Sequence, residues 1–211
     1  MMRYHRLTTA LAAGLLTLLC ACNAGTSAQP SPSPSSSPAA PSPTPTVSGS
    51  SEDTPASGGG VLSSFTAQDL NGNQVDQSVL ADYQLTMVNI WATFCGPCLS
   101  EMPELGEIHA EYADKGVQVV GIVADVLNQD GSFNEDQIAT AREAVSLTGA
   151  DYLHLLPSTD LMVAKLQYVS AVPETIFVDS QGNQVGESYL GARSKDQWIA
   201  IIDELLTQVE E

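Results

Sequence analysis

The chain has 211 residues, enough for one ordinary domain with additional segments, and a formal net charge of −18 from 25 acidic and 7 basic residues. The acidic excess lies in residues 61–211, which hold 23 acidic and 5 basic residues. Such a surface repels nucleic-acid phosphates and anionic lipid headgroups, so we expect no nucleic-acid partner.

The first 21 residues are interpreted as a lipoprotein signal peptide. Two arginines precede a short apolar run rich in small residues, which is typical of secretory signals. The end of this run resembles the bacterial lipobox, with Leu19 three residues before Cys22 and Ala21 directly before it. We therefore predict that Cys22 is lipidated and anchors the chain to the cell membrane. An ordinary signal peptide with incidental cysteines is the alternative.

Residues 22–60 are predicted to be the lipidated cysteine followed by a disordered tether rich in proline and serine. Eight of the twelve prolines lie here, and large apolar residues are almost absent. Such a segment cannot bury enough surface to offset the entropy of ordering it, and its prolines favour extended conformations. Residues 61–211 are predicted to form one domain.

The first half of this domain shows a hairpin, two buried strands and a helix between them. Apolar residues alternate on both sides of Asn71-Gly72, a strong hairpin signal. The nearly continuous apolar runs 85–92 and 116–124 predict strands that are buried on both faces. Residues 95–113 have helical spacing between them.

The second half continues with helices and a second hairpin. We predict helices over 135–148 and 158–168, a short strand within 151–157, and a hairpin that joins two strands at Gln181-Gly182-Asn183. The last segment is an amphipathic terminal helix that begins after Ser194. This order predicts an α/β fold in which helices cover the faces of a mixed sheet.

The sequence "CGPC" places Cys95 and Cys98 three residues apart, directly after a predicted strand. A structural zinc site needs four ligands, and no second cysteine pair exists, so we predict no metal site. A disulfide across so short a loop restrains little of the unfolded chain and is a poor structural crosslink. Both alternatives are disfavoured.

A redox role explains the spacing better. If a helix begins at Cys95, the free backbone N–H groups and the positive end of the helix dipole favour a thiolate there. Cys98 then lies one turn later, on nearly the same face. Cys95 is predicted to attack a substrate disulfide, and Cys98 is predicted to resolve the mixed disulfide.

The segment "WATFCGPCLSEMP" resembles the active site of the thioredoxin superfamily, specifically of TlpA/ResA-type thiol–disulfide oxidoreductases. The resemblance covers residues 62–206, including a leading hairpin that plain thioredoxin lacks. It implies an α/β thioredoxin-like fold with a central mixed β-sheet flanked by helices and an added N-terminal β-hairpin. It also implies a membrane-anchored catalytic domain on the extracytoplasmic side, and no cofactor.

The resemblance assigns further residues to the substrate-binding surface: Trp91, Gly96, Pro97, Val172 and Pro173. Pro173 corresponds to a cis-proline that faces the cysteine pair in this superfamily. The backbone of Val172 would then be free to pair with an extended substrate strand.

The resemblance also interprets four further residues in and before the active-site helix. Phe94 replaces a second tryptophan, and Pro103 matches a proline that removes one backbone donor from the helix. Asn89 replaces the buried, titratable aspartate of plain thioredoxin. Glu101, one turn beyond Cys98, matches the acidic residue below the cysteine pair and could exchange a proton with Cys98. A solvated glutamate at the start of the helix is the alternative.

Other titratable residues are given non-catalytic interpretations. His109 is predicted to be a surface residue and His154 a strand residue, because no serine nucleophile motif lies nearby. The acidic residues of 128–137 do not follow the order of an EF-hand loop, so we interpret this segment as a solvated insertion near the active face.

Three functions remain open from the sequence. The first is a reductase of oxidised exported proteins that receives electrons from a membrane donor of the CcdA/DsbD type and works as a monomer. The second is a thiol oxidase or isomerase that uses the same pair. The third is a non-enzymatic binding lipoprotein. The Gly-Pro dipeptide between the cysteines resembles that of reducing thioredoxin and favours the first.

Overall fold

The computed structural model describes residues 59–209 of the chain. The predicted signal peptide, the lipidation of Cys22 and almost all of the predicted tether lie outside the described residues. In chain order, the strands and α-helices are β1 (Thr66–Gln68), β2 (Gln74–Asp76), β3 (Leu85–Trp91), α1 (Gly96–Tyr112), β4 (Val117–Val123), α2 (Glu135–Thr148), β5 (Leu153–Leu155), α3 (Thr159–Ala164), β6 (Glu174–Val178), β7 (Gln184–Leu190) and α4 (Lys195–Val209).

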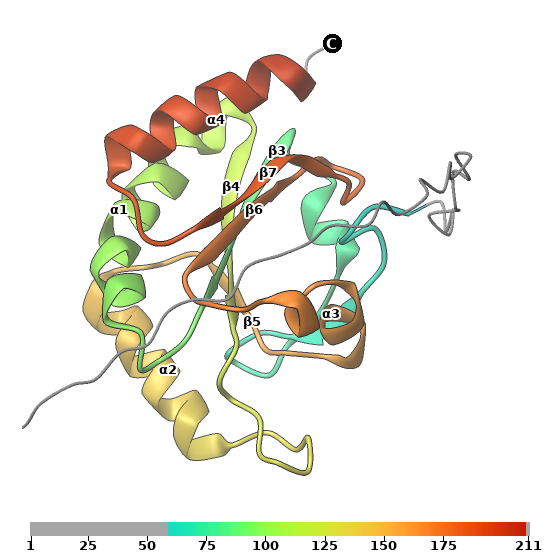
Figure 1. Cartoon of the computed structure of the whole chain (residues 1–211), viewed down its shortest axis with the longest axis vertical. Helices are drawn as coiled ribbons and strands as arrows, with labels where there is room; N and C mark the ends of the chain where they lie inside the picture. Colours follow the sequence, from blue (N-terminus) through green and yellow to red (C-terminus); the bar gives the residue numbers. More distant parts are fainter. Residues whose placement is uncertain (1–58, 210–211) are drawn as a thin grey trace, which may run out of the picture. The chain divides into compact units, whose positions relative to one another are not determined.

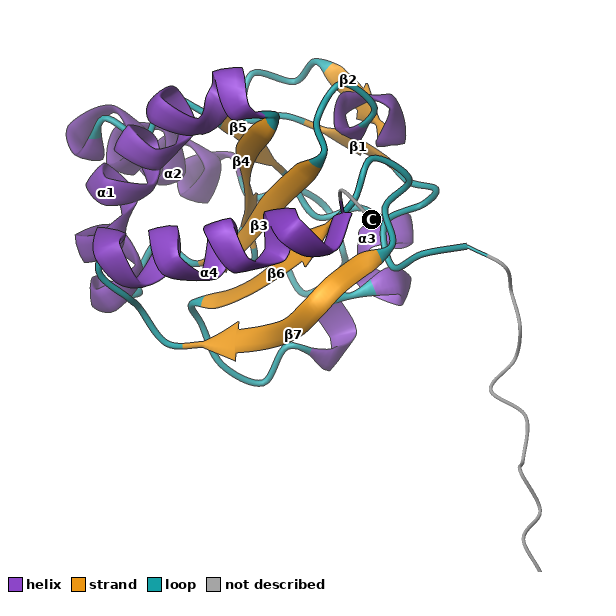
Figure 2. Ribbon diagram, turned by 90° about the horizontal axis from the view of Figure 1, so that it is seen from above, coloured by secondary structure: helices purple, strands orange, loops and turns teal. Residues whose placement is uncertain are grey.

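The strands form a small hairpin and a five-stranded mixed sheet. β1 and β2 pair antiparallel, and the larger sheet has the order β5-β4-β3-β6-β7. β4 is parallel to both β3 and β5, whereas β6 is antiparallel to both β3 and β7. Figure 2 shows this sheet with β7 at one edge and β5 at the other. The α/β fold with a mixed sheet and a leading hairpin is confirmed.

The two apolar runs of the sequence become the centre of the sheet. All residues of β3 and β4 are buried, as expected for adjacent strands covered on both faces. Together with α1 they form a strand–helix–strand unit whose helix packs back on the sheet. The start of α1 therefore lies at the carboxyl end of β3.

Helices cover both faces of the sheet. Figure 1 shows α1, α2 and α4 on one side and α3 with the leading hairpin on the other. Met87, Leu105 and Trp198 belong to the core on the first side, whereas Phe65 and Ile176 belong to the core on the second. The hairpin segment thus packs on the second core and is part of the domain.

Two elements are shorter than the sequence pattern predicts. The helix expected over 158–168 consists of α3 and a separate 3-10 turn over Leu166–Tyr168. Lys165 interrupts it with φ −143° and ψ −51°, and its ammonium group pairs with Glu174. The strand expected within 151–157 contracts to β5.

The segment 128–137 is partly helical. A bridge between Leu127 and Phe133 closes a small loop, and Asn134 caps α2 by accepting a hydrogen bond from the backbone of Gln137. The last three residues of the segment belong to the first turn of α2. Within residues 59–209, no helix combines the length and the apolar character needed to cross a bilayer.

Candidate active site

The cysteine pair begins the helix that follows the central strand. Cys95 is the N-cap of α1, and its Sγ accepts a hydrogen bond from the backbone N–H of Cys98 at 3.2 Å. Pro97 lies in the first helical turn, where its missing N–H leaves no intrahelical bond unmade. The predicted helix start at Cys95 is confirmed. The helix terminus therefore offers N–H groups and a positive dipole end to a thiolate of Cys95.

Cys95 and Cys98 form a disulfide whose Cα atoms lie 5.3 Å apart. Cys98 is fully buried, whereas Cys95 retains 5% of its surface. Gly96 and Pro97 are exposed beside it. Cys95 is thus the more accessible cysteine of the pair.

Pro173 lies at the same end of the sheet as the cysteine pair. The Val172–Pro173 peptide bond is cis, which confirms the expected isomer. β6 begins directly after it, and Glu174 pairs with Ile90 in antiparallel register. The next residues in this register are Trp91 and Pro173, so the cis-proline lies beside the chain that leads into the cysteine loop. Val172 is half-buried at this edge.

The structure separates the two aromatic residues of the motif. Trp91 is fully buried, whereas Phe94 is 78% exposed. The assignment of Trp91 to the substrate-binding surface is therefore corrected, because a buried indole contacts no substrate. Phe94 supplies the exposed aromatic surface next to Cys95.

Trp91 has a structural partner in β5. Its Nε1 donates to Nδ1 of His154 at 3.2 Å, and Nε2 of His154 lies 3.1 Å from the carbonyl oxygen of Ala150. His154 is buried in a strand, as predicted, and burial lowers its pKa to about 4. His109 is half-buried rather than a surface residue, and its Nδ1 accepts from the backbone of Val119.

Glu101 is the buried carboxylate of the site, with 3% of its surface exposed. Its Oε1 accepts from Nδ2 of Asn89 at 3.0 Å. Its Oε2 accepts from the backbone N–H of Arg193 at 3.1 Å and from Nε1 of Trp198 at 3.4 Å. The interpretation as a solvated helix residue is excluded.

Burial raises the pKa of Glu101, although the hydrogen bonds from Arg193, Asn89 and Trp198 oppose that shift. A carboxyl group with a raised pKa can hold or release a proton nearer neutral pH. Nδ2 of Asn89 also donates to Oγ1 of Thr175, while Oδ1 of Asn89 has no partner among the described atoms. Asn89 therefore orients the carboxylate without titrating.

A groove runs beside the cysteine loop. It has a volume of about 520 Å³, and its apolar walls come from the cysteine loop, α3 and the segment before Pro173. The apolar residues that line it are Ala92, Phe94, Ala124, Met162, Leu166, Val169, Ala171 and Val172. Phe94, which directly precedes Cys95, and Val172, which directly precedes the cis-proline, both line this groove.

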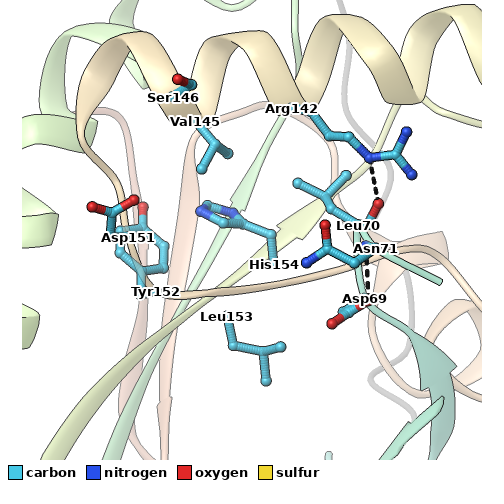
Figure 3. Close-up of a pocket in the computed structure, with 10 residues that line it drawn as sticks. All are labelled: Asp69, Leu70, Asn71, Arg142, Val145, Ser146, Asp151, Tyr152, Leu153 and His154. Atoms are coloured by element: carbon cyan, nitrogen blue, oxygen red, sulfur yellow. Dashed lines mark hydrogen bonds between the residues drawn. The ribbon is translucent and has the colours of Figure 1, made fainter. Parts of the chain in front are cut away.

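A second cavity, of about 460 Å³, lies between the hairpin turn, α2 and β5. Figure 3 shows Arg142 reaching from α2 to the carbonyl oxygen of Leu70, with the ring of His154 between this contact and Tyr152. None of the predicted site residues lines this cavity. The cavity is therefore separate from the cysteine pair.

Several site residues escape prediction from the sequence. Arg193 and Trp198 reach Glu101 from the β7–α4 region, more than ninety residues along the chain. Trp198 is visible in the sequence only as part of the apolar face of the last helix. Arg193 carries no local signal, because its contact is made by the backbone N–H, which every residue except proline possesses.

Comparisons with known proteins identify the family. The model of the Redoxin family matches residues 56–204. The thiol-disulfide oxidoreductase ResA of Oceanobacillus iheyensis is 43% identical over 56 residues, which are 25% of this chain and 29% of that protein. ResA of Bacillus thuringiensis is 26% identical over 133 residues, which are 63% of this chain and 69% of that protein.

A solved structure shows the same fold. A thioredoxin-family thiol:disulfide interchange protein from Chlorobium tepidum superposes with a TM-score of 0.56 at 24% identity, covering 68% of this chain and 93% of that one. The family match includes Cys95, Cys98 and the cis-proline. The chain therefore belongs to the redoxin family and is a ResA/TlpA-type thiol–disulfide oxidoreductase of the thioredoxin superfamily.

Proposed function

We propose that the protein reduces disulfides in exported proteins on the extracytoplasmic side of the cell membrane. The reduced pair supplies two electrons. The Cys95 thiolate attacks one sulfur of the substrate disulfide, forming a mixed disulfide and releasing one substrate thiolate, which takes up a proton. The Cys98 thiol loses its proton and attacks Sγ of Cys95, which forms the enzyme disulfide and releases the second substrate thiolate.

The observation that carries this proposal is the position of Cys95 as N-cap of α1, with Cys98 buried one turn behind it. The arrangement gives a reachable nucleophile and a shielded resolving thiol. Glu101, buried on the same helix, is the group proposed to accept the proton of Cys98. The Gly-Pro dipeptide supports the reducing direction.

The proposed substrate is a protein segment in extended conformation. Phe94, Val169 and Val172 would contact apolar side chains next to the substrate cysteine, and Gly96, Pro97 and cis-Pro173 would border its backbone. The backbone of Val172 would add the segment as a short strand. Such binding needs little sequence specificity, which suits a reductase of several exported proteins.

The proposed anchor is a lipid on Cys22, followed by the tether over residues 23–60. This tether would link the domain to the membrane, and the domain is proposed to work as a monomer. The proposed electron source is a membrane protein of the CcdA/DsbD type, which would reduce the Cys95–Cys98 disulfide by the reverse exchange.

Two other functions use the same residues and are separable by experiment. A thiol oxidase or isomerase would donate or reshuffle disulfides with the same cysteine pair. A binding lipoprotein would use the groove without turnover. The presence of a reachable cysteine and a buried one at a helix start favours an exchange reaction over binding alone.

The test is to trap the mixed disulfide. Cys98→Ala is expected to accumulate a covalent adduct between Cys95 and a disulfide-containing peptide, because no resolving thiol remains. Cys95→Ala is the matched control and is expected to form no adduct. If neither variant traps the peptide and the reduced wild type turns over none, the protein is not an oxidoreductase of this kind.

A further inference from the structure

The loop that leads into Cys95 is held by the carboxylate of Asp125, which lies in the turn after β4. Both carboxylate oxygens of Asp125 lie 3.1 Å from the backbone nitrogen of Thr93, which donates to them. Oγ1 of Thr93 donates to Oδ2 of Asp125 at 2.6 Å. Asp125 thus binds the residue that lies two positions before the nucleophile.

The insertion noted in the sequence completes this contact. Nε2 of Gln137, in the first turn of α2, donates to Oδ2 of Asp125 at 3.0 Å and to Oγ1 of Thr93. The backbone N–H of Asn134 bonds to the carbonyl oxygen of Val126, which closes the loop between Asp125 and α2. The segment 126–134 therefore presents Gln137 to the cysteine loop.

The negative charge of Asp125 has no cationic partner within residues 59–209, since none of the ion pairs there includes it. Each basic side chain of that part of the chain is engaged elsewhere: Lys115 over Tyr112, Arg142 on Leu70, Lys165 on Glu174, Arg193 over Tyr189 and Trp198, and Lys195 on Glu107 and Glu111. The charge of Asp125 is hydrogen-bonded but not neutralised.

We propose that Asp125 is a positioning residue for Cys95. Asp125 fixes the cysteine loop through Thr93, and its uncompensated negative charge disfavours the Cys95 thiolate. This inference rests on the proposed function and deepens it. A charge that destabilises the thiolate destabilises the reduced pair above the pH at which Cys95 ionises. The reduced pair then passes its two electrons more readily to a substrate disulfide, and the Cys95–Cys98 disulfide forms as it does so.

The expected size of the effect follows from distance. Two residues of extended chain and one hydrogen bond place Asp125 within ~10 Å of Cys95. At a partly exposed site, a unit charge at that distance changes an ionisation equilibrium by about threefold to tenfold. This change is measurable in a comparison of two variants.

The experiment compares Asp125→Asn with Asp136→Asn in the otherwise unchanged protein. Asp136 lies exposed in the first turn of α2, so its substitution removes the same charge from the same segment without touching Thr93. The rate at which iodoacetamide alkylates Cys95 is followed against pH in the reduced proteins. The equilibrium of each protein with glutathione is measured above the pH midpoint of that alkylation.

For Asp125→Asn we expect the alkylation midpoint to fall by about half a pH unit to one unit, and the glutathione equilibrium to move about threefold to tenfold toward the reduced pair. A tenfold shift corresponds to about 30 mV. Asp136→Asn should change both quantities by less than a third as much. Equal effects of the two variants would overturn the inference.

A second variant separates charge from geometry. Thr93→Val removes the hydroxyl donor but keeps the charge of Asp125, so the midpoint should stay at the wild-type value while the protein loses stability to urea. If Thr93→Val moves the midpoint as far as Asp125→Asn, or if Asp125→Asn lowers only stability, the charge has no role. The reduction potential of the wild-type protein tests the reductase function itself. A failure of the proposed reductase function can therefore be told apart from a failure of the proposed role of Asp125.

Discussion

Nε1 of Trp91 donates a hydrogen bond to Nδ1 of His154 at 3.2 Å, which joins the end of β3 to the edge strand β5. The other ring nitrogen lies 3.1 Å from the carbonyl oxygen of Ala150. Together these contacts select the neutral tautomer with its proton on Nε2. Because β3 leads into the cysteine loop, the neutral His154 ring supports the backbone that carries the active site.

The His154 ring predicts an acid-sensitive stability. Its pKa is lowered to about 4 by burial, whereas the unfolded chain binds the proton near pH 6.5. The stabilisation is therefore complete above pH 6.5 and is lost as the pH falls toward 4, at about 1.4 kcal/mol per pH unit from this group. Glutamine offers one acceptor and one donor without titrating, so His154→Gln should lack this slope.

The measurement is urea unfolding of both proteins from pH 7 to pH 4. The difference in unfolding free energy between wild type and His154→Gln should change across this window, with the wild type losing more. Parallel pH curves for the two proteins would show that His154 does not titrate as the structure indicates.

Glu101 predicts the pH dependence of turnover. Burial raises its pKa, and under the proposed function the deprotonated carboxylate is the form that would accept the proton of Cys98. The rate at which Cys98 resolves a mixed disulfide should therefore rise with pH as Glu101 ionises. Glu101→Gln should slow that step by about 100-fold near neutral pH and remove the Glu101 ionisation from its pH profile.

Stopped-flow measurement of the resolving step from pH 4 to pH 9 checks this prediction. Glu107→Gln is the matched control, because Glu107 lies on the solvent side of α1 and Lys195 keeps its second partner, Glu111. A Glu101→Gln profile with the wild-type shape and rate would mean that another group takes the proton.

Much of the fold is predictable because its signals are local. The fully buried strands are continuous apolar runs, the first hairpin turns at Asn71-Gly72, and the cysteine pair follows β3 directly. The contact of Trp91 with His154 is not local, since 63 residues separate them. No local signal in the sequence shows this contact, so the resemblance assigned Trp91 to the substrate-binding surface, whereas the fold turns its indole inward.

The ion pair beside the cis-proline carries a stability prediction. Lys165 binds Glu174, and the side chains of both are about one-tenth exposed. Lys165→Met would leave the carboxylate of Glu174 buried without a cation and should lower the unfolding free energy by about 3 kcal/mol. Adding Glu174→Leu should recover most of this loss, because the unpaired charge is removed.

Urea unfolding of the single and double variants gives the coupling between the two residues. Losses that simply add in the double variant would show that the pair behaves as two independent solvated groups.

The groove predicts a role for an exposed aromatic side chain. Phe94 is 78% exposed and packs against little of the domain, so Phe94→Ala should leave the urea midpoint unchanged. Loss of its contact with an apolar peptide should raise KM by about threefold to thirtyfold at nearly constant kcat. Leu147→Ala is the control, because Leu147 is 79% exposed on α2 and lies outside the groove. Equal KM values for the two variants would show that the groove does not bind the substrate.

The reduction potential of the Cys95–Cys98 pair is the most direct measurement of electron flow in this protein. The full chain would be equilibrated with glutathione or dithiothreitol buffers, and the fraction of disulfide measured by alkylation. We predict a potential near the thioredoxin figure of about −270 mV, which makes the reduced pair a strong electron donor. A potential near about −120 mV would contradict the reductase function and identify a disulfide donor instead.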